Sequence, residues 1–279
     1  MMQPASLLDI DARGVASLTL NRPEVHHAFD DQLIARLIDQ LEEVRLTEAR
    51  LLVLRSSGKS FSAGADLAWM QRMAQMSQAE NLQDAQQLAL LMERLDLLPC
   101  PTLCLVQGAA YGGAVGLIAC CDVALASDQA SLCLSEVKLG LAPAVISPYV
   151  LRAIGERALR RYALTAEVIS ATTAAELGLV HQVVAAADLE HKSEQLVQRL
   201  LNNGPKALQA CKQLLRYVGD HPINATTQAR TTACIAQLRV EEEGQAGLSA
   251  FFAKRPPPWQ PGVCEEPHEE THEEARQKN

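Results

Sequence analysis

The sequence predicts an α/β core followed by an all-helical region. Over roughly the first 185 residues, short apolar runs typical of buried strands alternate with stretches whose apolar residues recur at helical spacing. From about Ala186 onward only the helical spacing remains. Hydrophobic residues make up 48% of the chain but aromatic residues only 4%, so we expect a core built mainly from Leu, Ala, Val and Ile.

The first elements are a β-hairpin, a helix and a buried strand. Residues 6–11 and 16–21 alternate between apolar and polar side chains and flank a turn signal at residues 12–14. Residues 31–45 repeat apolar positions at helical spacing, and residues 51–55 form a short apolar run. The order strand, strand, helix, strand is typical of an α/β protein.

The middle of the chain continues the alternation. The stretch FSAGADLAWM leads from a loop into a helix, and Asp66 is placed to cap the start of that helix. Further elements expected here are a helix over 80–98 ended by Pro99 and Pro101, strands over 102–106 and 122–126, and a loop interrupted by Pro143 and Pro148.

The C-terminal region is expected to be a separate helical portion. Its helical stretches cover residues 189–201, 205–218, 226–240 and 243–255, and the run PPPWQPG then ends it as an extended segment. The last residues are rich in acid and lack apolar periodicity, which predicts a solvated tail. We therefore divide the chain into a core over 1–188, a helical region over 189–258 and an acidic, disordered tail over 259–279.

Composition narrows the function classes. The net charge is −8 and no basic stripe is interleaved with aromatic residues, which argues against nucleic acid as a partner. No apolar run reaches the roughly 18 residues that span a bilayer, and the N-terminus lacks the pattern of a signal peptide. The eight cysteines show no metal-ligand spacing. We expect a cytoplasmic protein with reduced, buried cysteines, no metal site and no membrane partner.

The glycine pair Gly112-Gly113 lies where a helix is about to begin after a strand. A dinucleotide fingerprint is excluded because Tyr111 stands where its first glycine should be. Close packing of the helix against a sheet would explain the glycines, and so would an anion site made by free amides at the helix start. Taken alone, the glycine pair favours packing.

A second strand-to-helix transition favours the anion site over the packing explanation. Ser62-Ala63-Gly64-Ala65-Asp66 also follows a strand and opens a helix. Two such turns, each supplying free N–H groups from small residues, suit an oxyanion hole with one donor from each turn. We therefore expect the two turns to act on one developing negative charge.

Several motifs together resemble the enoyl-CoA hydratase/isomerase (crotonase) family, over about residues 5 to 258. The SAGAD and glycine-pair elements are specific in combination. The motifs are NRPEVHHAF (21–29), FSAGADL (61–67), GAAYGGAVGL (108–117), CDVALAS (121–127) and LSEVKLGLAP (134–143). The resemblance implies a spiral of β-β-α turns followed by a helical segment that mediates homotrimers, often paired into hexamers. It implies an acyl-CoA substrate and no cofactor other than the CoA of that substrate.

The resemblance also assigns catalytic roles. It implies that the amides of Ala63 and Gly113 hold the thioester oxygen as it gains negative charge. One of the two glutamates of the family's hydratases falls on Glu136, which we expect to exchange the proton at the acyl α-carbon and to position water. The other falls on Gly116 and is absent. The residues expected to bind substrate or CoA are Ala28, Ala65, Asp66, Leu67, Gly112, Gly116, Tyr149 and Lys254.

The single glutamate leaves the reaction open between hydration and double-bond isomerisation. The Trp69 context and the SEVKLGLAPAVISP loop look most like bacterial methylglutaconyl-CoA hydratases of leucine degradation, which favours hydration of a branched glutaconyl-CoA. Hydratases of isohexenylglutaconyl-CoA in acyclic terpene breakdown look similar. We interpret Gly116 electrostatically, because a buried acid there would repel the distal carboxylate of such a substrate. A rival from another class is a noncatalytic acyl-CoA or RNA binder.

Other polar residues receive structural expectations. Asp122 is expected to hold backbone amides at a helix end or strand start. Lys254 and Arg255 match family positions that approach the CoA phosphates, but they also suit the cationic end of a helix. His26 and His27 are expected to lie on the surface.

Overall fold

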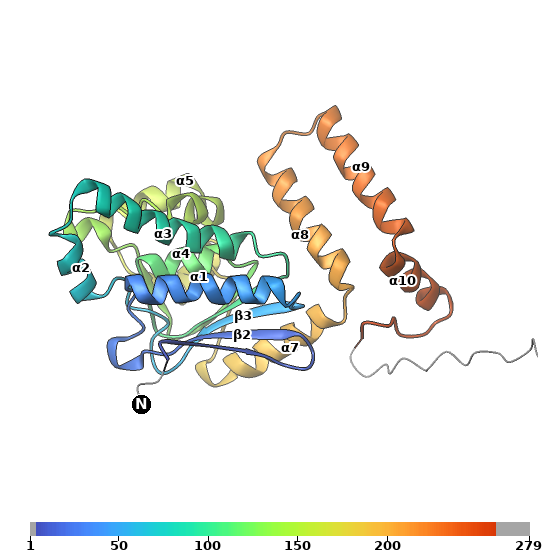
Figure 1. Ribbon diagram of the computed structural model, residues 1–279, viewed down its shortest axis with the longest axis horizontal. Helices are drawn as coiled ribbons and strands as arrows, with labels where there is room; N and C mark the ends of the chain where they lie inside the picture. Colours follow the sequence, from blue (N-terminus) through green and yellow to red (C-terminus); the bar gives the residue numbers. More distant parts are fainter. Residues whose placement is uncertain (1–3, 261–279) are drawn as a thin grey trace, which may run out of the picture.

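The computed structural model describes residues 4–260, and it confirms the α/β core with a helical C-terminal region (Figure 1). A six-stranded sheet has the order β1-β2-β3-β4-β6-β9, and a three-stranded sheet has the order β5-β7-β8. Only the β1–β2 hairpin and the β7–β8 pair are antiparallel among the paired strands. The strands are β1 Ser6–Ile10, β2 Val15–Leu20, β3 Leu51–Ser56, β4 Thr102–Val106, β5 Ala109–Tyr111, β6 Val123–Ser127, β7 Ser131–Cys133, β8 Ile169–Ser170 and β9 Gln182–Val184.

The helices connect these strands in β-β-α turns. In β4-β5-α4 and β6-β7-α5, one strand joins the large sheet, the next joins the small sheet and a helix follows. The helices are α1 Asp31–Leu46, α2 Leu67–Met73, α3 Gln78–Asp96, α4 Gly113–Cys120, α5 Ser147–Thr165, α6 Ala171–Glu176, α7 Leu189–Leu201, α8 Pro205–Asp220, α9 Ala225–Val240 and α10 Glu242–Phe252, with short 3₁₀ turns at Pro23–Val25, Glu136–Leu139 and Ala186–Asp188.

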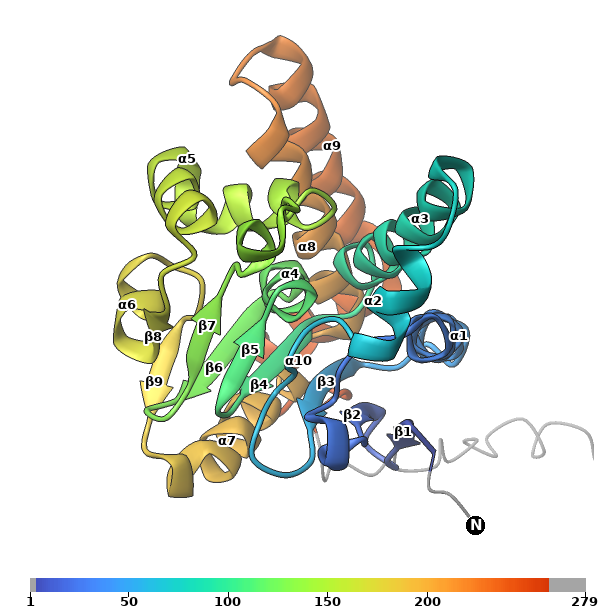
Figure 2. The same cartoon turned by 90° about the vertical axis from the view of Figure 1, so that its left-hand side faces the viewer.

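Strand alternation divides the core into two layers. On β3, Leu52 and Leu54 face the larger cluster, which includes α1, α3, α4 and α5, whereas Leu51 and Val53 face the smaller one. This follows from the two-residue period of a strand, which sends neighbouring side chains to opposite faces of the sheet. Both layers are mostly aliphatic, as the composition predicts. Figure 2 shows α4 in the middle of the helical layer and α7 across the sheet from it.

Helix α7 packs with the sheet, although the sequence places it in the C-terminal helical region. Its residues Leu189, Val197 and Leu201 belong to the smaller hydrophobic cluster, together with residues of β3, β4 and β6. The apolar layer of the core therefore continues past the boundary expected at residue 188. The helices that project from the core begin with α8 (Figure 1).

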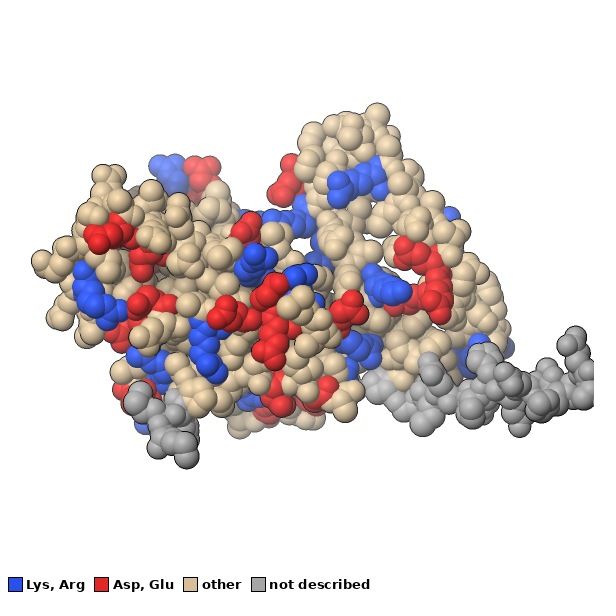
Figure 3. Space-filling model, viewed as in Figure 1, with Lys and Arg blue, Asp and Glu red and all other residues tan. Residues whose placement is uncertain are grey.

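The projecting helices expose large apolar side chains. Helix α8 contains no buried residue, and the exposed fraction is 72% for Val240, 76% for Phe251 and 77% for Phe252. Figure 3 shows that much of this part carries no charged side chain on the face in view, while acidic and basic groups are interspersed over the core. Exposed apolar patches are typical of interaction surfaces.

The structure corrects several details. Pro148 lies in the first turn of α5, where proline is compatible with a helix, and does not continue the preceding loop. Residues 257–260 turn back through a Gln260 N–H to Pro257 hydrogen bond of 3.1 Å, so the expected extended segment is wrong there. Five cysteines are buried, but Cys211 is exposed and Cys234 is half-buried. The acidic tail from residue 261 onward, with Cys264, lies outside the described residues.

The described part of the chain contains neither a membrane-spanning helix nor a cluster of metal ligands. None of its helices is long and apolar enough to cross a bilayer. Between residues 4 and 260, no three His, Cys, Asp or Glu side chains gather in a way that could hold a metal ion.

Candidate active site

The small sheet brings the two glycine-containing turns together. Ser62 forms a parallel bridge with Ala110, and Ala110 lies in β5, the strand that leads into Gly112 and Gly113. The Tyr111 N–H donates to the Ser62 carbonyl at 2.9 Å. The turn before α2 and the turn before α4 are therefore held side by side by main-chain hydrogen bonds, as the oxyanion-hole hypothesis requires.

The amide of Ala63 is not free, so its assignment as an oxyanion donor is wrong. In this turn, four of the five amides already donate at 2.7–3.2 Å, and the amide of Ala65 has no acceptor within residues 4–260. The paired amides are Ser62 to the Ala109 carbonyl, Ala63 to the His26 carbonyl, Gly64 to Ser62 Oγ and Asp66 to the Phe29 carbonyl. The free amide of this turn is therefore that of Ala65, so Ala65 takes the place of Ala63 as the candidate donor.

Gly64 allows the two turns to approach closely. It adopts φ +89°, in the left-handed region, and a Cβ atom there would lie 2.9 Å from the Tyr111 carbonyl oxygen. A side chain at this position would strain the backbone and push the turns apart. The glycine of SAGAD is thus required for the geometry, while the alanine after it supplies the donor.

Gly112 and Gly113 start α4 in the way that an anion site needs. Gly112 is the N-terminal cap with φ +54°, and its own N–H donates to the Cys133 carbonyl at 2.9 Å. Gly113 is the first helical residue, and its N–H has no partner in the described part of the chain. The first amides of a helix point along its axis and carry partial positive charge. The glycine pair therefore serves both a close approach and a free donor.

Glu136 faces this helix start. A Cβ atom on Gly112 would lie only 3.3 Å from Glu136 Oε1, so a larger residue at 112 would displace the carboxylate. The Oε2 atom is buried and accepts no hydrogen bond from residues 4–260. Burial raises the pKa of Glu136, because the charged form is poorly solvated there, and the residue's own amide offsets this in part. A half-buried carboxylate with an unpartnered oxygen beside free amides is suited to proton transfer.

Gly116 does not line the site, contrary to its assignment as a substrate-binding residue. It is buried in α4, and a Cβ atom there would lie 2.3 Å from Ile146 Cγ2 and 3.1 Å from Met92 Sδ. Ile146 is itself 2% exposed. The missing side chain at 116 is thus explained by packing, because Ile146 occupies the space, and this steric reason replaces the electrostatic one.

Ala28 and Leu67 lie next to the turn at residues 62–66 (the donor turn), and Asp66 is the last residue of that turn. Phe29 pairs with Ala65 as a parallel bridge, which places Ala28 beside the turn. Asp66 caps α2, as predicted, by accepting from the amides of Ala68 and Trp69 at 2.9 and 3.1 Å. Leu67 is 77% exposed at the start of α2, so its side chain is available to a ligand.

Two other candidates belong to later elements, Tyr149 to the first turn of α5 and Lys254 to the residues after α10. The Tyr149 ring stands 5.7 Å from the Arg152 guanidinium, and burial raises the pKa of its hydroxyl, with a further contribution from Cys120 at the far end of α4. Lys254 follows the end of α10, and Figure 1 shows that helix on the far side of the projecting hairpin from α2. Within one chain, Lys254 therefore lies away from α4 (Figure 1).

The two adjacent histidines differ in burial. His26 is exposed, as expected, but His27 is 1% exposed, so its placement on the surface is wrong. The His27 Nδ1 atom accepts from the Arg22 amide at 2.9 Å, which leaves Nε2 to donate to the Ser57 carbonyl at 2.6 Å. Burial lowers the pKa of His27, so the ring is a neutral structural element.

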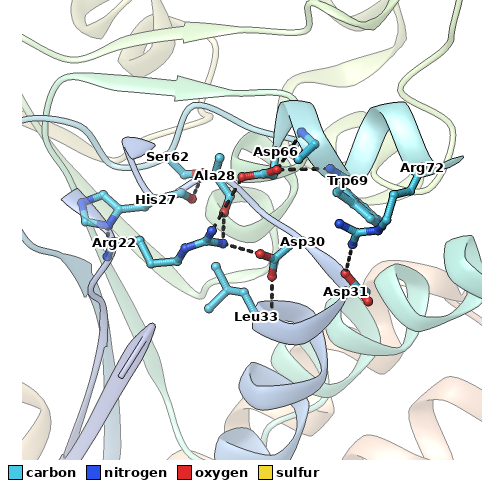
Figure 4. A network of polar contacts seen from close by, with 11 residues as sticks. Arg22, His27, Ala28, Asp30, Asp31, Leu33, Ser62, Asp66, Trp69 and Arg72 are labelled. Atoms are coloured by element: carbon cyan, nitrogen blue, oxygen red, sulfur yellow. Dashed lines mark hydrogen bonds and ion pairs between the residues drawn. The ribbon is translucent and has the colours of Figure 1, made fainter. Parts of the chain in front are cut away.

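Sequence reasoning missed the role of Arg22. Its guanidinium donates to the Ala28 carbonyl at 3.1 Å and to Asp30 at 2.7 Å, and it lies 3.6 Å from Asp66 (Figure 4). The residue is part of the NRPEVHHAF motif, so the motif was found without the function of its arginine. Nothing in a single sequence indicates that one side chain reaches both helix caps.

Asp122 has the structural role that the sequence predicts. Its Oδ2 atom accepts from the Thr102 amide at 2.8 Å, from Thr102 Oγ1 at 2.9 Å and from Lys212 Nζ at 2.7 Å. The carboxylate thereby joins β4, the end of α4 and the projecting helix α8.

Comparisons with known proteins show the family of this chain. Residues 11–262 match the enoyl-CoA hydratase/isomerase family. The crystal structure of an enoyl-CoA hydratase from Shewanella pealeana is 48% identical with a TM-score of 0.89, covering 92% of this chain and 96% of that one. The 2,3-dehydroadipyl-CoA hydratase of Escherichia coli is 32% identical over 87% of this chain and 94% of its own length. The enoyl-CoA isomerase/hydratase fer4 of Mycosarcoma maydis is 31% identical over 88% and 92%.

Proposed function

Because the chain belongs to the enoyl-CoA hydratase/isomerase family, we propose that it hydrates the α,β double bond of a branched glutaconyl-CoA thioester. In the proposed reaction, 3-methylglutaconyl-CoA becomes 3-hydroxy-3-methylglutaryl-CoA, a step of leucine degradation. The observation that carries the proposal is the unpartnered carboxylate of Glu136 beside the amide-bearing start of α4. The CoA belongs to the substrate, and the chemistry requires no further cofactor.

The two free amides would stabilise the thioester oxygen. When a nucleophile adds at the β-carbon, negative charge moves through the α-carbon onto the thioester oxygen. The N–H groups of Ala65 and Gly113 are fixed by their turns before the substrate arrives, so little reorganisation accompanies this charge. Each such donor is typically worth about 3 kcal/mol in the barrier.

Glu136 would handle the protons of the reaction. As a carboxylate it takes a proton from the attacking water, and as a carboxylic acid it returns a proton to the α-carbon of the enolate. Burial raises the pKa of Glu136, which makes its carboxylate a stronger base than that of an ordinary glutamate. One acid can serve both steps when water and α-carbon lie on the same side of the acyl plane.

The choice of a dicarboxylic acyl group rests on similarity to hydratases. One relative is named for 2,3-dehydroadipyl-CoA, which is the thioester of a dicarboxylic acid, and it aligns with nearly the whole chain. Gly116 gives no support to this choice, because Ile146 and Met92 explain the missing side chain by packing.

A second candidate is isomerisation of a β,γ to an α,β double bond. The specific observation that favours it is again the single acid: moving a proton between two carbons of an enolate needs one acid–base group and no water. The relative from Mycosarcoma maydis is named for both isomerase and hydratase activity. Isohexenylglutaconyl-CoA remains the alternative substrate for hydration.

We also propose that the chain assembles as a homotrimer, or as a hexamer of paired trimers. The exposed apolar side chains of α9 and α10 support this, because water would otherwise cover Val240, Phe251 and Phe252. Lys254 follows Ala253, the C-terminal cap of α10. A CoA phosphate contact from Lys254 would then come from a neighbouring copy, since α10 lies away from α4 in its own chain (Figure 1), and Glu136 faces the start of α4.

The test is a direct assay of three thioesters. Purified protein is incubated with 3-methylglutaconyl-CoA, isohexenylglutaconyl-CoA and a 3-enoyl-CoA, and products are followed by mass and by the loss of enoyl absorbance. Gain of one water by 3-methylglutaconyl-CoA is the expected result. Conversion of only the 3-enoyl-CoA, without a change in mass, would replace hydration by isomerisation.

A binding measurement separates an enzyme from a binder. Glu136→Gln retains size and hydrogen-bonding capacity but removes the acid. We expect this variant to bind the thioester by calorimetry and to lose turnover. A chain that binds acyl-CoA but converts none of the three thioesters, in wild-type or variant form, would be a noncatalytic binder.

A further inference from the structure

Arg22 contacts both helix caps that border the donor turn. Its guanidinium donates to Asp30, the N-terminal cap of α1, at 2.7 Å and lies 3.6 Å from Asp66, the N-terminal cap of α2. It also donates to the Ala28 carbonyl at 3.1 Å. The side chain is 20% exposed and the two acids 18% and 16%, so these charges meet in a partly desolvated place (Figure 4).

The two caps stand directly after the backbone pair that carries the donor. Phe29 and Ala65 form a parallel bridge, and Asp30 and Asp66 are the next residue on each side. The Phe29 N–H donates to the Gly64 carbonyl and the Phe29 carbonyl accepts from the Asp66 N–H, both at 2.7 Å. One guanidinium therefore fixes the separation of the two chain segments whose pairing sets the direction of the Ala65 N–H.

The main chain around Arg22 contacts the beginning of the turn at residues 62–66. The Arg22 amide donates to His27 Nδ1 at 2.9 Å, and His26 and His27 adopt φ +50° and +55°. In this left-handed conformation their carbonyls accept from the Ala63 N–H and from Ser62 Oγ, both at 2.8 Å. A positive φ at two consecutive non-glycine residues is a strained arrangement, which persists where surrounding contacts hold it.

We propose that Arg22 is the positioning residue of the oxyanion hole. By holding Asp30, Asp66 and the Ala28 carbonyl at once, it presents the Ala65 N–H to the thioester oxygen. A lysine cannot replace it, because one ammonium group lacks the planar fork of donors that reaches several acceptors. The inference rests on the proposed function in one respect, namely that a thioester oxygen binds between Ala65 and Gly113.

A spectroscopic probe tests the orientation without turnover. An aryl-conjugated enoyl thioester of CoA absorbs at longer wavelength when hydrogen bonds polarise its carbonyl. We expect wild-type protein to shift this band on binding, Arg22→Lys to shift it less and Arg22→Met least. Arg50→Met is the matched control, because Arg50 also ties distant segments together, through the Leu201 and Trp259 carbonyls, at the opposite end of β3.

Kinetics give the second readout. A donor displaced by about 1 Å costs roughly 100-fold in rate, so we expect kcat of Arg22→Met to fall about 100-fold with KM changed less than about threefold. Arg22→Lys is expected to fall about 10-fold, which keeps the test valid if the methionine variant folds poorly. Arg50→Met should retain kcat even if its melting temperature falls as far as that of Arg22→Met.

The outcomes separate this inference from the proposed function. A wild-type band that does not shift would remove the oxyanion site itself, and the inference with it. A wild-type shift that Arg22→Met and Arg22→Lys both reproduce in full would overturn only the role of Arg22. A loss of shift in Arg22→Met that Arg50→Met matches would make the effect one of general stability and would also overturn it.

Discussion

An acid lies near each end of α4, and the two acids differ in whether their carboxylates have hydrogen-bond partners. At the C-terminal end, Asp122 Oδ2 accepts three hydrogen bonds, from the amide and hydroxyl of Thr102 and from Lys212. At the N-terminal end, Glu136 Oε2 is buried and accepts no bond in residues 4–260, and the neighbouring Gly113 amide donates none.

The difference distinguishes a structural acid from a reactive one. A buried polar group without a partner costs free energy, so a protein normally satisfies it. Near Asp122 the other charges are also paired, because Asp96 holds both Arg152 and Arg216. Glu136 Oε2, near the other end of α4, has no such partner within residues 4–260, and in the proposed function a substrate would supply it.

The largest expected effect is that of Glu136→Gln. Removing the acid–base group should lower kcat roughly 1000-fold, while the glutamine amide still fills the space beside Gly112. Steady-state assay of the thioester that the wild type converts measures the effect. A variant that keeps a tenth of the wild-type rate would place the acid elsewhere and end the contrast with Asp122.

Gly113→Pro tests the amide at the same end. Proline fits the first position of a helix but has no N–H, so the substitution removes one donor and leaves α4 able to form. We expect kcat to fall on the order of 100-fold or more, as for other lost oxyanion donors. Gln78→Pro, at the first position of α3 and exposed, is the matched control. Equal losses in both variants would point to helix damage.

Asp122→Asn examines the other end of α4. The asparagine loses the ion pair with Lys212 and weakens two hydrogen bonds to Thr102, so the free energy of unfolding should fall by about 1–3 kcal/mol. Because Asp122 takes no part in the chemistry, kcat should stay within about twofold of wild type in the folded fraction. Urea unfolding and assay of the same preparation check both. A kcat loss comparable to that of Glu136→Gln would contradict the division of roles.

Much of this contrast could be predicted from the sequence. The hairpin follows from alternating apolar residues, the C-terminal helices follow from apolar residues at helical spacing, and the Asp66 cap follows from an acid placed just before a helix. Asp122 was recognised as structural because an acid at a helix end commonly holds amides. Gly113 and Glu136 follow from the resemblance of their motifs to the enoyl-CoA hydratase/isomerase family.

The remaining features depend on contacts between distant segments. Ala63 and Ala65 are equivalent in a pattern of small residues, and only the His26 carbonyl, brought over by a left-handed turn, decides which amide is free. Gly116 was assigned an electrostatic reason because Ile146, thirty residues further on, is not a sequence neighbour. Elements as short as β5 and β8 show too few residues for any period to be recognised.

The smallest expected effect is a pH-dependent difference in stability between wild type and Glu136→Gln. Burial raises the pKa of Glu136 in the folded state, so the folded protein binds this proton more firmly than the unfolded chain does. The favourable contribution is therefore fully present below the ordinary glutamate pKa of about 4.3, and it is lost as pH rises through the raised, folded value. Glutamine does not titrate, so the variant should gain stability relative to wild type over that window and keep the gain at higher pH.

Urea unfolding of both proteins at a series of pH values measures this difference, and Asp122→Asn provides the contrast, since it should be less stable than wild type near neutral pH. A Glu136→Gln variant less stable than wild type above the window would mean that the carboxylate has a partner in the folded protein. The two ends of α4 would then be satisfied alike, and the unpartnered oxygen would no longer distinguish the reactive acid from the structural one.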